Sequence, residues 1–80
     1  MKTVSVRYFA AFRDATGVGS ESVETGAETL RALFRECAER HDALFEEQAA
    51  LVAVNDEMAD WEAGFASADE VLFFPPVAGG

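Results

Sequence analysis

One segment of the sequence has apolar residues at helical spacing, and strand-like segments lie on both sides of it. Because a single helix of ordinary length covers only one face of one sheet, this arrangement favours a two-layer α+β domain. Thr25 and Glu28 have the spacing of a capping box, and Gly26 is an alternative N-cap, so the helix is expected to begin close to residue 26. Six residues form the apolar stripe of the expected helix: Leu30, Leu33, Phe34, Cys37, Ala38 and His41.

The residues before the helix predict two strands joined by a short helical turn. Apolar and polar residues alternate over 3–9, which is typical of a half-buried strand. A helical turn is expected at 10–15 and a break at 17–19, where two of three residues are glycine. The polar segment 20–25 suits an edge strand that pairs with the first as a hairpin.

The residues after the helix predict an acidic loop and further strands. Brief helical character is expected near Leu44 and Phe45 within this loop. The apolar segment 51–54 indicates a buried strand, and 55–57 a turn into a short partner at 58–61. A last apolar strand at 71–74 must end at the two prolines that follow, because proline cannot donate a ladder hydrogen bond.

This order of elements, strand–strand–helix–strand–strand, is typical of a β-grasp or ubiquitin-like domain. We expect a mixed sheet of four to five strands covered by one main helix. The folded domain would span 1–74, and residues 75–80 would form an extended C-terminal tail. The length of 80 residues fits one domain with a modest core.

Charge and cysteine content exclude several classes of function. Fifteen acidic and six basic side chains give a formal net charge of -9, which argues against nucleic acid as a partner. No export signal or membrane-spanning stretch is visible, so we expect no membrane partner and a cytoplasmic location. A single cysteine cannot form an intrachain disulfide or a thiolate metal site, and no metal is expected. Two origins of the acidity remain open: a high-salt cytosol and GC-rich codon usage.

The residue types that usually carry catalysis do not converge. Cys37 and His41 are the sole residues of their types, and both fall on the helix stripe. We expect Cys37 to pack as a small apolar residue, and His41 to interact with the helix dipole or its last carbonyl groups. The carboxylates are too dispersed to form a catalytic pair and are expected to make a solvated acidic surface.

The C-terminal residues are the most informative about function. The six residues from Pro75 to Gly80, which end in Gly79 and Gly80, form a tail that when extended could reach about 20 Å from the sheet. Because glycine has no Cβ, such an end can thread a narrow channel and present its carboxylate to a nucleotide. This geometry suits activation as an acyl-adenylate and capture of the acyl group by sulfur or an amine. A frayed end is the alternative interpretation.

Four stretches resemble the MoaD family, the small sulfur-carrier subunits of molybdopterin synthase. The strongest is the ending DEVLFFPPVAGG (69–80), and the resemblance covers nearly the whole chain. The other three stretches mainly support the fold: VRYFAAFRDATG (6–17), ETLRALF (28–34) and LVAVNDEMADW (51–61).

The resemblance implies a specific role for the tail. An E1-like enzyme that uses ATP would adenylate Gly80, and a sulfur donor protein would convert it to a thiocarboxylate. The tail would then insert into the large synthase subunit and give its sulfur to cyclic pyranopterin monophosphate. The chain itself would bind no cofactor and have no active site. The resemblance assigns Gly79 to threading and an arm to the partner's groove: Phe74, Pro75, Pro76, Val77 and Ala78.

Phe9 and Phe73 are further candidates for contact with the large subunit, and core packing is the alternative for both. The acidic segment 42–48 departs from the common pattern of the family and bears on partner choice. A heterotetramer with two large subunits is expected from the resemblance alone.

Other functions remain open. The chain could be a ubiquitin-like modifier of the archaeal type, joined through Gly80 to lysines of target proteins, or it could serve both roles. A sulfur carrier for thiamine thiazole or tRNA thiolation is less favoured. A non-reactive binding module is a different class, and blocking Gly80 would distinguish it from the carriers.

Overall fold

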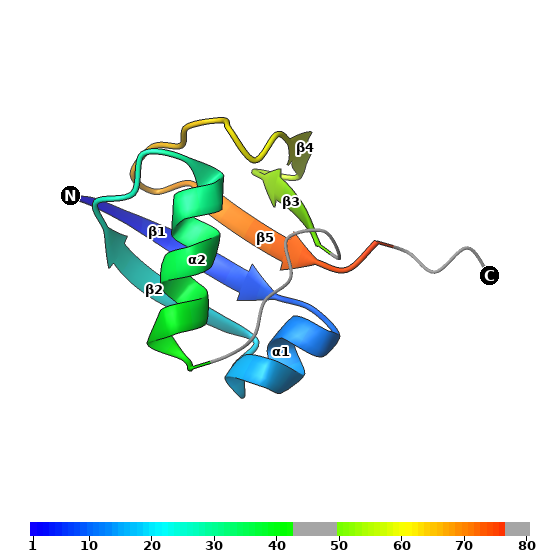
Figure 1. Cartoon of the computed structure of the whole chain (residues 1–80). Coiled ribbons are helices and arrows are strands. Elements are labelled where there is room, and N and C mark those ends of the chain that lie inside the picture. Colours follow the sequence, from blue (N-terminus) through cyan, green and yellow to red (C-terminus); the bar gives the residue numbers. More distant parts are fainter. Residues whose placement is uncertain (43–49, 77–80) are drawn as a thin grey trace.

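The structure, a computed structural model, describes residues 1–42 and 50–76. In these two ranges, two helices and five strands follow one another (Figure 1). Their bounds are β1 (Lys2–Tyr8), α1 (Ala11–Thr16), β2 (Ser20–Thr25), α2 (Leu30–Arg40), β3 (Leu51–Val54), β4 (Glu57–Ala59) and β5 (Glu70–Phe74).

The five strands form one mixed sheet in the order β2-β1-β5-β3-β4. β1 pairs antiparallel with β2 and parallel with β5, whereas β3 is antiparallel to both β5 and β4. The two predicted hairpins and the edge position of β2 are therefore confirmed, and the architecture is the β-grasp expected from the sequence. The last strand lies in the middle of the sheet, held by neighbours on both sides.

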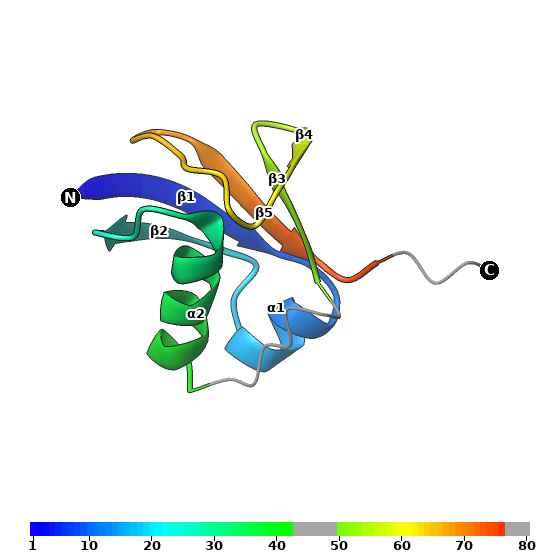
Figure 2. The same ribbon diagram turned by 45° about the horizontal axis from the view of Figure 1, so that its top comes forward.

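The core lies between the sheet and α2, which packs against one face (Figure 2). Side chains of β1 alternate as predicted, with Val4, Val6 and Tyr8 buried beneath the helix. Phe34 lies at the centre, with ring centroids 4.8 Å from Trp61 and 4.9 Å from Phe73. Four of the six predicted stripe residues are buried: Leu30, Leu33, Phe34 and Cys37.

The helix start differs from the prediction. Thr29 is the N-cap of α2, and its hydroxyl accepts a hydrogen bond from the Ala32 amide at 3.2 Å. Capping by Thr25 or Gly26 is therefore wrong. Thr25 is the last residue of β2, and its buried hydroxyl donates to Glu36 at 2.6 Å and accepts from the Ala27 amide at 2.9 Å.

The other observed ends of helices and strands agree with the predicted ones to within one or two residues. Gly17 ends α1 in the left-handed conformation, with φ of 79°, as its place after the predicted turn suggests. The predicted helical character near Leu44 and Phe45 lies outside the described residues. Within 1–42 and 50–76, no helix is long and apolar enough to cross a membrane.

Candidate functional site

The base of the predicted arm is fixed by the middle of the sheet. Phe74 ends β5 and is paired with Leu51 of β3. On the other side, the amide of Phe9 donates to the Phe73 carbonyl at 3.2 Å. The chain leaves the sheet after Phe74, where Pro75 is half-buried and Pro76 is exposed. The predicted tail residues Val77, Ala78, Gly79 and Gly80 lie outside the described residues.

Phe73 belongs to the core, so its proposed role in partner contact is wrong. Its side chain is 0% exposed and points toward α2, where it packs against Phe34 and Trp61. Phe9 and Phe74 are half-buried. The guanidinium of Arg7 lies 5.5 Å from the centroid of the Phe9 ring. Phe9 and Phe74 thus remain available at the surface beside the arm.

The sheet face opposite α2 carries four apolar side chains, of which the sequence analysis selected Phe74 alone. We call Leu51, Met58, Leu72 and Phe74 the outer apolar face. Three of them are half-buried, and Met58 is 62% exposed. Leu51 is paired with Phe74, and Leu72 and Met58 both face Ala53, which joins the four residues into one patch.

An open hollow of about 370 Å³ adjoins this face. It is lined by Leu51, Val52, Met58, Ala59, Asp60 and Trp61. Period-2 alternation along 70–74 predicts that residues 72 and 74 point away from residues 71 and 73, but it does not indicate which of the two faces is buried.

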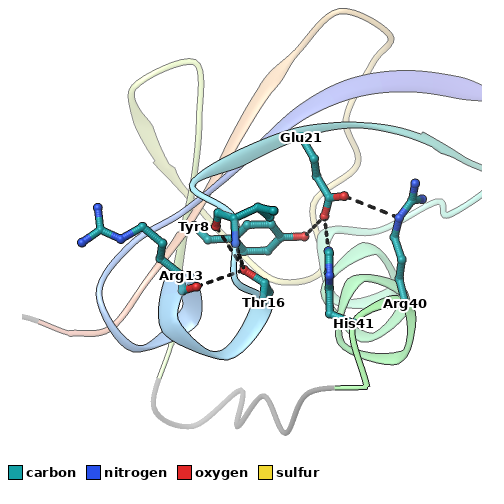
Figure 3. Close-up of polar contacts among 7 residues, drawn as sticks. Tyr8, Arg13, Thr16, Glu21, Arg40 and His41 are labelled. Carbon is teal, nitrogen blue, oxygen red and sulfur yellow. Dashed lines mark hydrogen bonds and ion pairs between the residues drawn. The ribbon is translucent and has the colours of Figure 1, made fainter.

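A second cluster joins the edge of the sheet to the end of α2 (Figure 3). One carboxylate oxygen of Glu21 accepts from the Tyr8 hydroxyl at 2.6 Å and lies 2.5 Å from His41 Nε2. The other oxygen lies 3.5 Å from Nε of Arg40. The His41 ring therefore pairs with Glu21 rather than with the last carbonyl groups, and only its backbone amide bonds to the Cys37 carbonyl.

The ionisation of these groups follows from burial and from their hydrogen bonds. Burial raises the pKa of Glu21, but hydrogen bonds from Tyr8 and His41 and the charges of His41 and Arg40 outweigh it, so the net shift is downward. Burial is also the main reason why the pKa of Tyr8 is raised. These contacts link β1 and β2 to the end of α2, and they favour the ionised form of Glu21.

Cys37 is packed as the sequence predicts. Its thiol is buried, and burial raises its pKa to about 11, which disfavours the reactive thiolate. Within the described residues, no group of three or more histidine, cysteine, aspartate or glutamate side chains could hold a metal ion.

Comparison with known proteins gives consistent matches. The model of the ThiS family matches residues 6–80. The chain is 32% identical to the molybdopterin synthase sulfur carrier subunit of Haemophilus influenzae, over 96% of this chain and 99% of the relative. The subunit of the same name from Escherichia coli gives the same identity and coverage.

Solved structures share the fold. A putative molybdopterin converting factor subunit 1 from Pyrococcus furiosus has a TM-score of 0.78 at 32% identity, with 96% of this chain and 100% of that chain covered. In the BexX/CysO complex of Amycolatopsis orientalis, the matching chain has a TM-score of 0.67 at 30% identity, with coverage of 96% and 99%. Small archaeal modifier protein 1 of Haloferax volcanii reaches 0.82 at 22% identity, with coverage of 96% and 100%, and this likeness concerns the fold alone.

Proposed function

The chain belongs to the ThiS family, and from this membership we propose that it is the sulfur-carrier subunit of a molybdopterin synthase, with Gly80 as the sulfur-bearing residue. The observation that carries the proposal is the similarity to two subunits of that name over nearly the whole of each chain. The anchored end of β5 supports it, because a tail that leaves a fixed strand can be delivered to a partner.

The proposed reaction sequence starts at the carboxylate of Gly80. An E1-like enzyme joins the carboxylate to the AMP part of ATP and releases pyrophosphate. A sulfur donor protein then supplies sulfur, AMP leaves, and the carboxylate becomes a thiocarboxylate. In the large synthase subunit, the thiocarboxylate gives its sulfur to cyclic pyranopterin monophosphate, and water supplies the oxygen with which Gly80 returns to a carboxylate. ATP is used by the activating enzyme, and this chain binds no cofactor.

In this proposal the chain acts by docking, which replaces a bimolecular encounter with a tethered one. The pairing of β5 with β1 and β3 fixes where the arm begins. Pro75 and Pro76 restrict the backbone of the arm and so reduce the entropy lost on insertion. Gly79 is the threading residue, and Phe9 and Phe74 contact the large subunit.

Intact mass spectrometry of the protein from its native host tests the proposal. The expected result is a population heavier by the exchange of one oxygen for sulfur, assigned to Gly80 by fragmentation. Deletion of Gly80 should abolish this species and the sulfur transfer while the thermal unfolding curve stays unchanged, because a terminal residue beyond the sheet adds little stability. If sulfur transfer survives the deletion, the proposed role of Gly80 is wrong.

Conjugation to proteins is a second candidate for the same activated group. An amine would then replace the sulfur donor as the acceptor, and Gly80 would end in an isopeptide bond to lysine. The acidic composition with a single lysine keeps this candidate open. Branched peptides carrying Gly80 on lysine, found without any thiocarboxylate, would make conjugation the main function.

A further inference from the structure

An activated carboxyl group reacts with any accessible amine or thiol, including those of its own chain. We propose that this fold keeps the activated Gly80 out of reach of the chain's own nucleophilic side chains, so that the acyl group passes only to an external acceptor. The inference rests on the proposed function, since it requires activation at Gly80. It is carried by the contacts of Lys2 and by the direction of β1 relative to β5.

Lys2 is the single lysine of the sequence, and its amine is engaged. The amine donates a hydrogen bond to the Phe65 carbonyl at 3.0 Å. It also lies 4.0 Å from the centroid of the Phe65 ring, which adds a cation–π contact. An amine must lose its proton and leave both contacts before it can attack a carbonyl carbon.

The sheet also places Lys2 far from the start of the arm. β1 and β5 run parallel, with Tyr8 opposite Phe73, so Phe74 lies level with Phe9. Lys2 is seven residues further back along β1, which corresponds to about 23 Å at the rise of a strand. Figure 1 shows the N-terminus, where β1 begins, and the arrowhead end of β5 at opposite ends of the sheet.

The number of residues from Pro75 to Gly80 limits how far Gly80 can lie from the sheet. Six residues span at most about 20 Å when fully extended, which is less than the distance back along the sheet to Lys2. The effective concentration of Gly80 at Lys2 is therefore low, because only near-complete extension back along the sheet brings them together.

The other strongly nucleophilic side chains are enclosed, and the exposed α-amine of Met1 precedes Lys2 at the end of β1 that is far from the arm. Cysteine, tyrosine and histidine each occur once. The thiol of Cys37 and the ring of Tyr8 are buried, and the Tyr8 hydroxyl donates to Glu21. Nε2 of His41 is held by the same carboxylate. Each would have to leave the core or this cluster in order to react.

The step that the fold prevents is intramolecular amide formation. The amine nitrogen would attack the carbonyl carbon of Gly80, the bond to the leaving group would break, and the amine proton would pass to solvent. With an adenylate the leaving group is AMP, and with a thioester it is a thiol. The cyclic product would have lost one water relative to the free acid.

A chemically installed thioester tests the inference without the activating enzyme. The full chain is made as an intein fusion and released as a small-molecule thioester at Gly80, in three forms: wild type, Arg7→Lys and Thr3→Lys. Both changes put an amine on the outer face of β1. Arg7 is two residues, about 7 Å, from the level of Phe74, whereas Thr3 is six residues, about 20 Å, from it.

Intact mass and peptide mapping then separate cyclic amide from free acid. Wild type and Thr3→Lys should hydrolyse to the free acid, and Arg7→Lys should give a ratio of cyclic amide to acid that is higher by about tenfold or more. Cyclisation of the wild type at any amine to the extent seen for Arg7→Lys would overturn the inference. So would a failure of Arg7→Lys to cyclise, because distance would then not be the limiting factor.

Competitive acetylation tests the engagement of Lys2 separately. With a limiting amount of an N-hydroxysuccinimide acetate, the lysine introduced by Thr3→Lys should be acetylated several-fold faster than Lys2 in the same molecule. Equal rates would refute the protection of Lys2 by Phe65. Neither experiment depends on sulfur transfer, so a negative result in the native-host mass spectrum would refute the proposed function and leave these measurements intact.

Discussion

The carboxylate of Glu21 ties β1, β2 and the end of α2 together, and we predict that Glu21→Gln destabilises the fold in a pH-dependent way. The side chain is only 17% exposed, and it contacts Tyr8, His41 and Arg40. Glutamine keeps the size and can still accept from Tyr8, but it loses the charge that the two basic groups face. The change therefore isolates the electrostatic part of the cluster.

The expected magnitude follows from the two contacts that lose their charge. A hydrogen bond to a charged group contributes about 1.5–3 kcal/mol, and the 3.5 Å contact with the half-exposed Arg40 contributes less. We expect a loss of about 2 kcal/mol in the free energy of unfolding. For a domain of this size, that corresponds to a fall in Tm of roughly 8–16 °C.

The pH dependence has a definite sign. The pKa of Glu21 is lowered in the folded state, so the unfolded chain binds the proton more tightly. The stabilisation is present above the unfolded pKa of about 4.3 and is lost as pH falls through the lower folded value. The difference between wild type and Glu21→Gln should thus shrink as the solution is acidified.

Urea unfolding followed by Trp61 fluorescence measures this difference, because Trp61 packs against Phe34 in the core. Curves at about pH 6 and about pH 3 give the two limits. Glu24→Gln is the matched control: it removes the same charge from the same strand at an exposed position. An equal effect of both changes, or a Glu21→Gln effect that does not fall at low pH, would refute the reasoning.

Three further outcomes are expected. Phe73→Ala should cost about 3–5 kcal/mol by denaturant unfolding because the ring is fully buried, whereas Phe74→Ala should cost less and weaken binding of the large subunit instead; equal stability losses would contradict the assignment of faces. Cys37 should react with a maleimide only on unfolding, and a native-state rate like that of a free thiol would show that it is accessible. Gly17→Ala should lower stability by about 1 kcal/mol because of its φ of 79°, and an unchanged Tm would show that the turn relaxes.

Much of the fold could be predicted because two periods alternate along the chain. The helical stripe from Leu30 to Cys37 and the alternation in β1 are strong local signals, and the single helix between strand pairs limits the possible architectures. The N-cap was harder to predict, because Thr25, Gly26 and Thr29 all have suitable side chains or flexibility nearby. The pairing of β2 with β1 excludes Thr25 as the N-cap, because Thr25 is paired with Lys2 as a strand residue.

The surface beside the arm was less predictable, for a different reason. Residues 71–74 are all apolar, so no polar residue marks which side chains face the core. The register of β5 with β1 and β3 determines which side chains face the core, and this register places Phe73 inward and Phe74 outward. The contact between Glu21 and His41 joins residues 20 apart on different elements, and no local pattern indicates it.

The separation of Lys2 from the arm is a consequence of topology rather than of the residues near the arm. β1 and β5 are parallel neighbours, so the start of β1 and the end of β5 lie at opposite ends of the sheet. An antiparallel pair would put the start of β1 beside the end of β5, and any lysine there would lie within reach of Gly80. A chain whose function depends on an activated C-terminus can therefore carry a lysine at the start of β1, whereas a lysine at position 7 would compete with the external acceptor.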